Sequence, residues 1–407
     1  MPNTKAGVAA TGTGVRSRPR AVLPALCATQ ITSWGVLYYA FPVLNPAITH
    51  DTGWPARLTT AAFSAALIVS AAVGIYVGRV LDHRGPRAVM TAGSVLGPLS
   101  LLIVAAAPNL AVFTAGWLIA GAAMAATFYP PAFAALTRWW TPDHIRALTI
   151  VTLAGGLAST VFAPLTAVLA DHYSWRTTYA VLAAILAALT IPTHALALRA
   201  PWPPASDASP HRPAAAPDPA EHSRAFWMLA ATFTLSAFAM YAVVITLVPL
   251  FLERGYTTTQ AALALGLGGA GQTLGRTLYA ALARHTGTVT RTATLVGLGG
   301  LTTTAFVLVP GPYPLLVVLS VLAGIVRGNL TLLQATAVTD RWGTAHYGRL
   351  SGLLGAPAHA AAALAPFAGT LIAGPLGGYP TLFAVLAALS AAAAITAIGT
   401  RPKAREA

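Results

Sequence analysis

Acidic residues are scarce in this chain, and none of them lies inside a long apolar segment. Only 10 of the 407 residues are Asp or Glu, against 24 Lys and Arg. Charged residues make up 8% of the chain, whereas a soluble globular domain carries about 25%. With 56% hydrophobic residues and a mean hydropathy of +0.68, the composition excludes a soluble globule and indicates a protein that lies mostly in lipid.

Cysteine and the usual catalytic motifs are also nearly absent. Cys27 is the one cysteine, so an intrachain disulfide and a cysteine metal cluster are excluded. The chain has no phosphate-binding loop, metal-ligand cluster or nucleophile and base pair, so we expect no cofactor, no metal, no enzyme activity and no ATP-driven pump. Residues 266–271, GLGGAG, match a dinucleotide fingerprint, but no strand precedes them. They are predicted to form a small-residue packing face, together with Gly271 and Gly275.

Long apolar runs are what the chain has in abundance. Each run is near the 20 or so residues that a membrane-spanning helix needs. The sequence therefore predicts an all-α membrane protein with twelve spanning helices. The predicted spans are 22–45, 58–79, 88–107, 110–137, 147–170, 177–198, 226–250, 259–280, 292–309, 314–338, 350–373 and 379–399.

The basic residues between these runs predict the orientation. Nineteen Lys and Arg fall in the segments on the side of both termini, and only Arg57, Arg176 and Arg254 fall on the other side. Because basic loops stay inside the cell, both termini are predicted to be cytoplasmic, in a multi-pass protein of the cell membrane. The net charge of +14 is thus spread between helices, which argues against nucleic acid as a partner.

A proline-rich segment divides the chain into two blocks of six predicted helices. Residues 200–225 hold seven prolines among Ala, Ser and His, which favours a cytoplasmic linker over a packed helix. The predicted organisation is therefore a tail (1–20), an N-terminal bundle (21–199), the linker (200–225), a C-terminal bundle (226–400) and a second tail (401–407).

The two blocks resemble each other weakly. Pro46 precedes Gly53-Trp54 in the first block, and Pro249 precedes Gly255-Tyr256 in the second. Each pair opens the next predicted helix. Paired halves with a site between them are typical of transporters that expose one site alternately to the two sides of the membrane.

Residues 78–87, GRVLDHRGPR, predicted to be a loop between the second and third spans, resemble the signature loop of the major facilitator superfamily. The match keeps Gly78, Asp82, Gly85 and Arg87, and it has His83 where the pattern usually has Arg. The resemblance implies the major facilitator fold, two pseudo-symmetric six-helix bundles. It also implies that Asp82 steadies one conformation through neighbouring helix ends; an ordinary basic loop is the alternative reading.

Arg276 and Arg327 lie inside apolar runs, where a charge costs about 2.5–3.5 kcal/mol even on the lenient insertion scale. Arg276 is eight residues before Arg284 at the predicted end of the eighth span. In the oxalate/formate antiporter and monocarboxylate porter families, which this segment resembles, an arginine so placed binds the substrate carboxylate. The chain departs from that pattern at Ala280 and Arg284. Snorkelling of Arg276, and bonding of Arg327 to helix-end carbonyls, are the alternatives.

Further residues could complete an anion site. His359 is a third candidate cation, unless it is a packed histidine. Gln272 and Tyr279 flank Arg276 on its helix, and Tyr129 precedes Pro130 and Pro131 in the fourth span. The first span presents one helical face of amphipathic side chains, which predicts either a cavity wall or a helix contact: Gln30, Trp34, Tyr38, Phe41 and Asn45.

Together these features predict a secondary transporter that moves a small organic anion, a mono- or dicarboxylate. The anion and the lipid bilayer are its expected partners, and the protein is expected to be a monomer. An exporter of drugs or natural products is the alternative within transporters, although it would normally use an intramembrane acid for proton coupling. A membrane sensor is the alternative of another class, and it would need a cytoplasmic output module larger than the proline-rich segment.

Overall fold

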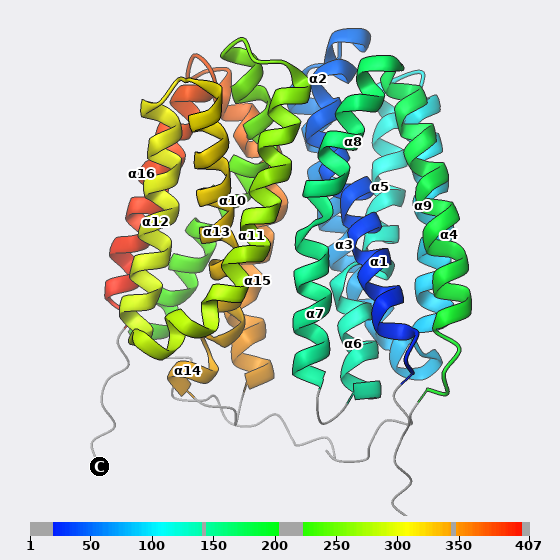
Figure 1. The fold of residues 1–407 in the computed structure, drawn as a ribbon, viewed down its shortest axis with the longest axis horizontal. Helices are drawn as coiled ribbons and strands as arrows, with labels where there is room; N and C mark the ends of the chain where they lie inside the picture. Colours follow the sequence, from blue (N-terminus) through cyan, green and yellow to red (C-terminus); the bar gives the residue numbers. More distant parts are fainter. Residues whose placement is uncertain (1–18, 141–143, 203–222, 343–346, 401–407) are drawn as a thin grey trace, which may run out of the picture.

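The computed structural model describes residues 19–140, 144–202, 223–342 and 347–400, apart from the side chains of Asp82 and residues 347–349. Helices dominate these residues (Figure 1). The first half contains α1 (Val22–Trp34), the π-helix η1 (Gly35–Tyr39), α2 (Ala40–Thr52), α3 (Ala56–Arg84), α4 (Pro86–Ala106), α5 (Leu110–Thr127), α6 (Tyr129–Trp140), α7 (His144–Gly156), α8 (Ala158–His172) and α9 (Trp175–Ala197). The second half contains α10 (Arg224–Glu253), α11 (Thr258–His285), α12 (Thr288–Leu308), α13 (Tyr313–Thr336), α14 (Thr339–Trp342), α15 (Tyr347–Ala373) and α16 (Tyr379–Ile398).

The predicted fold class is confirmed. Among the described residues, nine helical segments are long and apolar enough to cross a membrane. The helical stretches 22–52, 258–285 and 288–308 run beside them and complete the predicted set of twelve spans. The two halves stand side by side as separate bundles (Figure 1). Most of the predicted linker and both tails lie outside the described residues, so the limits proposed for those segments stay a prediction.

Several helices extend beyond the apolar runs that predicted them. Most of the segment 78–87, predicted to be a loop, is helical, because α3 continues to Arg84 and α4 begins at Pro86. Only Gly85 interrupts the two helices, with a φ of 76° that favours glycine. Hydropathy marks the part of a helix that lies in lipid, and polar helix ends that project from it carry no apolar signal.

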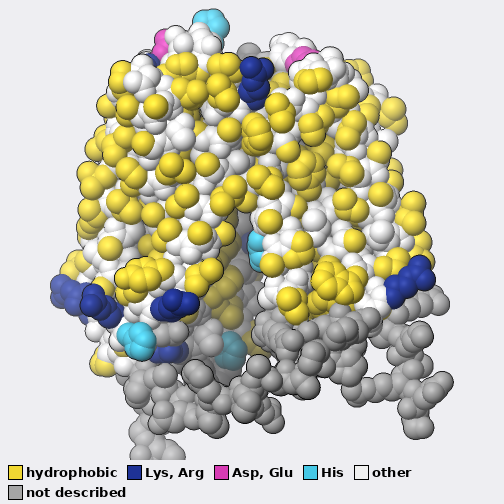
Figure 2. All heavy atoms as spheres, turned by 180° about the vertical axis from the view of Figure 1, so that it is seen from behind, with side chains coloured by type: hydrophobic (Ala, Val, Ile, Leu, Met, Phe, Trp, Pro, Cys, Tyr) yellow, Lys and Arg dark blue, Asp and Glu magenta, His cyan; other side chains and the backbone are white. Residues whose placement is uncertain are grey.

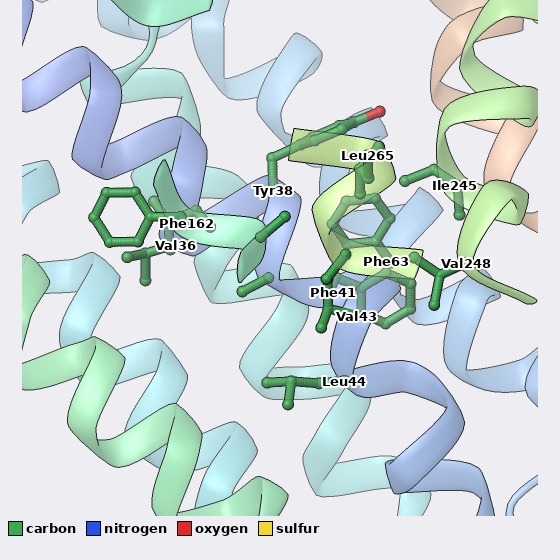
Figure 3. Packing of buried hydrophobic residues seen from close by; sticks show 14 of the residues in the cluster. Val36, Tyr38, Phe41, Val43, Leu44, Phe63, Phe162, Ile245, Val248 and Leu265 are labelled. Carbon is green, nitrogen blue, oxygen red and sulfur yellow. The ribbon is translucent and has the colours of Figure 1, made fainter. Parts of the chain in front are cut away.

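A buried hydrophobic cluster joins the halves in the part of the molecule toward the ends of α2 and α10 (Figure 3). It brings Phe41 and Phe63 of the first half against Val248 and Leu265 of the second. Phe41 and Phe63 stack with ring centroids 4.3 Å apart, and both are fully buried. Phe41, predicted to be on the possible cavity face, therefore belongs to the packed core.

Hydrogen bonds also connect the halves toward the end where α2 meets α3 and α10 meets α11, here called the distal end. The Ser64 hydroxyl of α3 accepts from the backbone N–H of Phe367 in α15 at 3.1 Å. The Thr160 hydroxyl of α8 donates to the carbonyl of Gly266 in α11 at 2.8 Å. Toward the other end, where α3 meets α4 (the basic end), the surface is hollowed between the halves (Figure 2). The halves are thus joined distally and separate toward the basic end.

Within the second half, α11 and α13 pack through glycines, as the sequence predicts for residues 266–275. A Cβ added to Gly324 of α13 would lie 1.9 Å from the carbonyl oxygen of Gly268. One added to Gly328 would lie 2.1 Å from the carbonyl oxygen of Gln272. These separations are far below contact distance, so the backbones approach as closely as glycine permits. This packing holds Gln272 beside α13.

Replacing Gly328 by alanine is expected to destabilise the protein by about 1–3 kcal/mol, because the new methyl group must push the two helices apart. Thermal unfolding of the purified protein in detergent measures this. The matched control is Gly74→Ala in α3, where an added Cβ meets nothing within 4 Å. Alanine there is expected to be neutral or mildly stabilising, since it is the better helix former. Equal unfolding temperatures for the two variants would contradict the close packing of α11 on α13.

At the distal end of each half, an acidic side chain joins the end of one helix to the start of another. Asp51 at the end of α2 accepts hydrogen bonds from Trp175 Nε1 at 2.8 Å and Arg176 Nη1 at 2.7 Å, both at the start of α9. Glu253 at the end of α10 accepts from the backbone N–H of Tyr379 at 2.8 Å, at the start of α16. Carboxylates are favourable at helix N-termini because the unpaired N–H groups there carry partial positive charge. In both halves an acid thus joins the first span to the sixth, through side chains in the first half and through a backbone N–H in the second.

The hydrogen bond from Trp175, followed by that from Arg176, lowers the pKa of Asp51 below its usual value. A lowered folded-state pKa means that the carboxylate stabilises the fold above the unfolded-state pKa, and that this contribution is lost as the pH falls through the folded-state pKa. Unfolding temperatures measured between about pH 3 and pH 7 should therefore fall more steeply in wild type than in Asp51→Asn, with the curves converging at acid pH. If the unfolding temperatures of wild type and Asp51→Asn fell in parallel, the hydrogen bonds of Asp51 would add no pH-dependent stability.

Candidate functional site

Three helices of the first half are interrupted. The first span contains the π-helix η1, the fourth breaks at Phe128 between α5 and α6, and the fifth breaks at Leu157 between α7 and α8. Pro130 and Pro131 explain the second break, because proline has no N–H for the carbonyls one turn earlier. One of those carbonyls, that of Thr127, instead accepts a hydrogen bond of 2.7 Å from Gln30 Nε2. Such interruptions expose backbone groups where continuous helices have none to offer.

Arg276 of α11 lies against the last turn of α7, across the interface between the halves. Its Nη1 donates to the carbonyl oxygen of Thr152, and its guanidinium lies beside Tyr129 at the start of α6, within electrostatic reach. The side chain is only 7% exposed, and its Nε is buried without a hydrogen-bond partner. The carbonyl end of a helix is the negative end of its dipole, so α7 compensates the charge in part. Its observed partners are neutral.

Two glycines at the end of α7 make room for this contact. A Cβ on Gly155 would lie 2.3 Å from the Tyr129 hydroxyl oxygen. One on Gly156 would lie 2.6 Å from Thr273 Oγ1 and 3.2 Å from Arg276 Nη1. The break after α7 therefore forms a cradle that only residues without a side chain allow, and it admits Tyr129 and Arg276 together.

Arg327 of α13 is partly buried and contacts its own half. Its Nε donates to Gln272 Oε1 at 2.9 Å, and its Nη2 is buried without a partner. It lines a cavity of about 50 Å³ inside the second half, between α10, α12, α13 and α16. The cavity also presents Ser236, Thr302, Thr303 and Ser390. Gln272, one turn before Arg276 on α11, thus bonds Arg327. Arg276 contacts α7 of the opposite half, and Arg327 lies within electrostatic reach of Tyr38 there.

Aromatic side chains of the first span complete the surroundings. Tyr38 is buried next to Phe63, and its hydroxyl has no hydrogen-bond partner (Figure 3). Trp34 contacts the ring of Tyr129, with centroids 5.2 Å apart, and its Nε1 is likewise unpartnered. The structure therefore places Trp34, Tyr129 and Arg276 in one chain of contacts, with Tyr38 one helical turn from Trp34.

Sequence reasoning missed one residue of this region, Tyr241 of α10. It is partly buried and lies within electrostatic reach of Arg276, of Arg327 and of Tyr38 in the other half. A signal was present: Tyr38 stands eight residues before Pro46, and Tyr241 eight residues before Pro249. The proline-based similarity of the halves thus pairs the two tyrosines across the interface.

Two predicted site residues lie elsewhere. Tyr279 points into the second half, where its hydroxyl hydrogen-bonds Thr336 of α13 at 2.7 Å. It also lies under the guanidinium of Arg291, 5.6 Å from the ring centroid. His359 is exposed on α15, about three turns before Thr370 on the same helix face. Because Thr370 contacts Thr60 of α3, His359 lies on the face of α15 that is turned toward α3.

The residues of the signature segment lie at the basic end. Gly78 and Asp82 are in the last turns of α3, and the side chain of Asp82 is outside the described structure. Arg87, in the first turn of α4, donates from Nε to the carbonyl of Ala195 in α9 at 2.9 Å. The segment therefore connects α3, α4 and α9, and the gating role of Asp82 stays a prediction.

The acids whose side chains are described lie near helix ends, and each has a partner there. Asp51 binds Arg176, Glu253 binds the start of α16, and Asp171 binds Thr259 across the halves. Asp340 forms an ion pair with Arg291. Within the described part of the chain, the central region around Arg276 therefore holds arginines, tyrosines, a tryptophan and amides, and it holds no carboxylate.

Comparisons with known proteins agree with this architecture. Residues 26–314 match the Major Facilitator Superfamily. A human protein, Monocarboxylate transporter 11, is 30% identical over 223 residues, which are 54% of this chain and 45% of that protein. Monocarboxylate transporter 13 of Bos taurus is 33% identical over 105 residues, 25% of this chain and 24% of that protein. An uncharacterized MFS-type transporter of Bacillus subtilis, YcxA, is 26% identical over 42% of this chain and 40% of its own length.

Solved structures share the fold at low sequence identity. The nucleoside transporter NupG superposes with a TM-score of 0.70 at 13% identity, covering 94% of this chain and 99% of its own. A bacterial homolog of the human lysosomal transporter Spinster gives 0.71 at 14% identity, covering 95% of each chain. The alignments to the curated relatives span less than half of those proteins, so they do not carry a substrate. The extent of the family match, with the helical architecture, shows that this multi-pass membrane protein belongs to the major facilitator superfamily.

Proposed function

We propose that the protein is a secondary transporter that carries a small organic anion, a carboxylate, across the cell membrane by alternating access. The observation that carries this proposal is Arg276, a buried guanidinium at the interface of the halves whose observed partners are a backbone carbonyl and a tyrosine. A charge buried in the membrane costs free energy, and neutral partners compensate that cost incompletely. A bound anion would compensate it. The two relatives named as monocarboxylate transporters support the same substrate class.

The position of Arg276 also supports alternating access. The halves meet at its level through the interrupted helices α5–α6 and α7–α8, where transporters of paired halves place their substrates. Any movement of α11 relative to α7 must change the contact of Arg276 with Thr152. A carboxylate offers the two oxygen acceptors that a guanidinium binds best, so it would replace that carbonyl with a stronger partner.

A proton-coupled exporter of drugs fits less well. The described acids lie near helix ends and are engaged there, so the centre lacks the carboxylate that such coupling would normally use. A membrane sensor would need an output module, and the proline-rich segment 200–225 is short for one. We therefore keep the anion transporter as the function.

The orientation belongs to the same proposal. The basic residues gather at the end where α3 meets α4 and α11 meets α12, so we place that end and both termini in the cytoplasm. In this orientation, the hollow between the halves faces the cytoplasm. We also expect a monomer to be sufficient, since one chain supplies both halves of the central region.

The test is thermal stabilisation of the purified full-length protein by separate carboxylates, inorganic phosphate, neutral sugars and cationic drugs. A ligand that binds the folded state raises its unfolding temperature by mass action. We expect concentration-dependent stabilisation by at least one carboxylate, and none by cationic drugs. Stabilisation by cationic drugs alone would contradict the anion proposal and favour the exporter.

A further inference from the structure

Three aromatic side chains form a continuous wall next to Arg276. This aromatic wall consists of Trp34 of α1 with Tyr129 and Phe133 of α6. The rings of Tyr129 and Phe133 stack with centroids 5.1 Å apart, and Trp34 lies 5.2 Å from Tyr129. Phe128 also stacks on Trp34, with ring centroids 4.0 Å apart, and this contact holds the indole in place. The wall is therefore a fixed apolar surface on the first half.

The wall differs from the aromatic core of the same half. Phe41, Phe63 and Trp117 are fully buried and contact one another. Trp34, Tyr129 and Phe133 instead remain partly exposed, although they already contact neighbouring rings. A ring surface that stays accessible next to the interface of the halves is free to contact a ligand, and a flat apolar ligand suits it best.

The wall and the charge are contiguous. Tyr129 contributes its ring to the wall, and its hydroxyl lies on the side of Arg276, next to adjacent glycines of α7. The indole Nε1 of Trp34 adds a buried donor without a partner. A ligand with its carboxylate at Arg276 would therefore lay its remaining atoms on the rings of the wall.

Among the described residues, Arg276 is the cation placed beside that surface. Arg327, the other intramembrane arginine, donates to Gln272, lines the cavity inside the second half and lies within electrostatic reach of Tyr38. The second anionic group of a dicarboxylate would lie on aromatic carbon, where its loss of hydration would not be compensated. The geometry therefore favours a ligand that has a single anionic group and is otherwise apolar.

We propose, on the basis of the proposed anion transport, that the substrate is an aryl monocarboxylate: its carboxylate binds Arg276, and its ring packs on Trp34, Tyr129 and Phe133. This narrows the substrate class from mono- or dicarboxylates in general to planar aromatic acids with a single charge. Small aliphatic acids have too little apolar surface to pack on the aromatic wall, so they would bind through the carboxylate alone.

The test compares ligands that differ in one property each, by titration of the purified full-length protein. Benzoate carries both the negative charge and the planar ring. Cyclohexanecarboxylate keeps the charge but has a puckered ring, and acetate keeps the charge but has no ring. Benzyl alcohol keeps the planar ring but has no charge. Terephthalate adds the second carboxylate. We expect benzoate to bind about tenfold or more tightly than acetate, with cyclohexanecarboxylate between them and with terephthalate and benzyl alcohol weakest.

Variants locate the effect. Trp34→Leu is expected to weaken the binding of benzoate about tenfold and the binding of acetate less than about twofold. Trp34→Phe should keep most of the difference in affinity between benzoate and acetate. The control is Trp227→Leu, which removes a tryptophan that is 59% exposed at the start of α10, and it should leave both affinities unchanged. If Trp34→Leu does not fold, the ligand series in wild type and in Trp34→Phe still decides the question.

The outcomes separate this inference from the proposed function. If acetate binds as tightly as benzoate, or if terephthalate does, the aryl monocarboxylate class is wrong and carboxylate transport stands. If benzoate is preferred equally in wild type and Trp34→Leu, the placement on the wall is wrong. If no carboxylate binds at all, the proposed function fails together with this inference.

Discussion

Replacing Arg276 by glutamine is expected to weaken carboxylate binding about 100-fold or more while the protein still folds. Removing one partner of a buried charged pair costs about 2–5 kcal/mol, and each 1.4 kcal/mol is a factor of about ten. Arg276→Lys keeps the charge but presents a single point of contact in place of the guanidinium fork, so we expect a loss of about tenfold. Titration of the purified variants with the carboxylate that stabilises wild type measures both effects.

Arg284 offers the matched control. It lies on the same helix two turns further on, in the last turn of α11, and it is exposed. Arg284→Gln removes the same charge from the same helix, and it should leave binding unchanged apart from screened long-range effects. Arg327→Gln should weaken binding less than Arg276→Gln, because Arg327 faces the cavity of the second half. Wild-type affinity in a folded Arg276→Gln protein would contradict the assigned site.

The fold could be predicted because its determinants are local. Length and apolarity alone mark most of the spans, and the glycines of α11 signal close packing wherever they lie in a helix. The helix ends could not be placed in the same way. Whether residues 78–84 are helix or loop depends on how the polar end of α3 projects from the bundle, and the apolar pattern says nothing about that.

The site could be predicted only in part. The depth of Arg276 follows from its place on the helix, but its partner is the backbone carbonyl of Thr152 near the end of α7. Backbone acceptors have no residue type that would mark them in a sequence. Arg327 and Tyr279 lie within plausible helices, yet both face into the second half. Which way a side chain faces depends on helix rotation within the bundle, a tertiary property.

The coupling mechanism follows from the partners of Arg276, and we expect obligatory anion exchange. Without an anion, the guanidinium must pass through the conformational change with neutral partners, and moving α11 away from α7 removes one of them, the Thr152 carbonyl. With a carboxylate bound, the charge is neutralised throughout. The loaded carrier should therefore cross readily and the empty carrier slowly. The alternative is proton symport through His359 or the substrate's own carboxyl group.

Proteoliposomes separate these mechanisms. Exchange predicts that labelled substrate enters at least about tenfold faster when unlabelled substrate is inside, that a proton ionophore has no effect, and that His359→Ala behaves as wild type. His172→Ala, at the distal end of α8, controls for the loss of an exposed histidine elsewhere. Rapid uptake into empty vesicles, driven by an imposed pH gradient and lost in His359→Ala but not in His172→Ala, would overturn exchange. It would then assign the proton to the histidine on the α15 face that is turned toward α3.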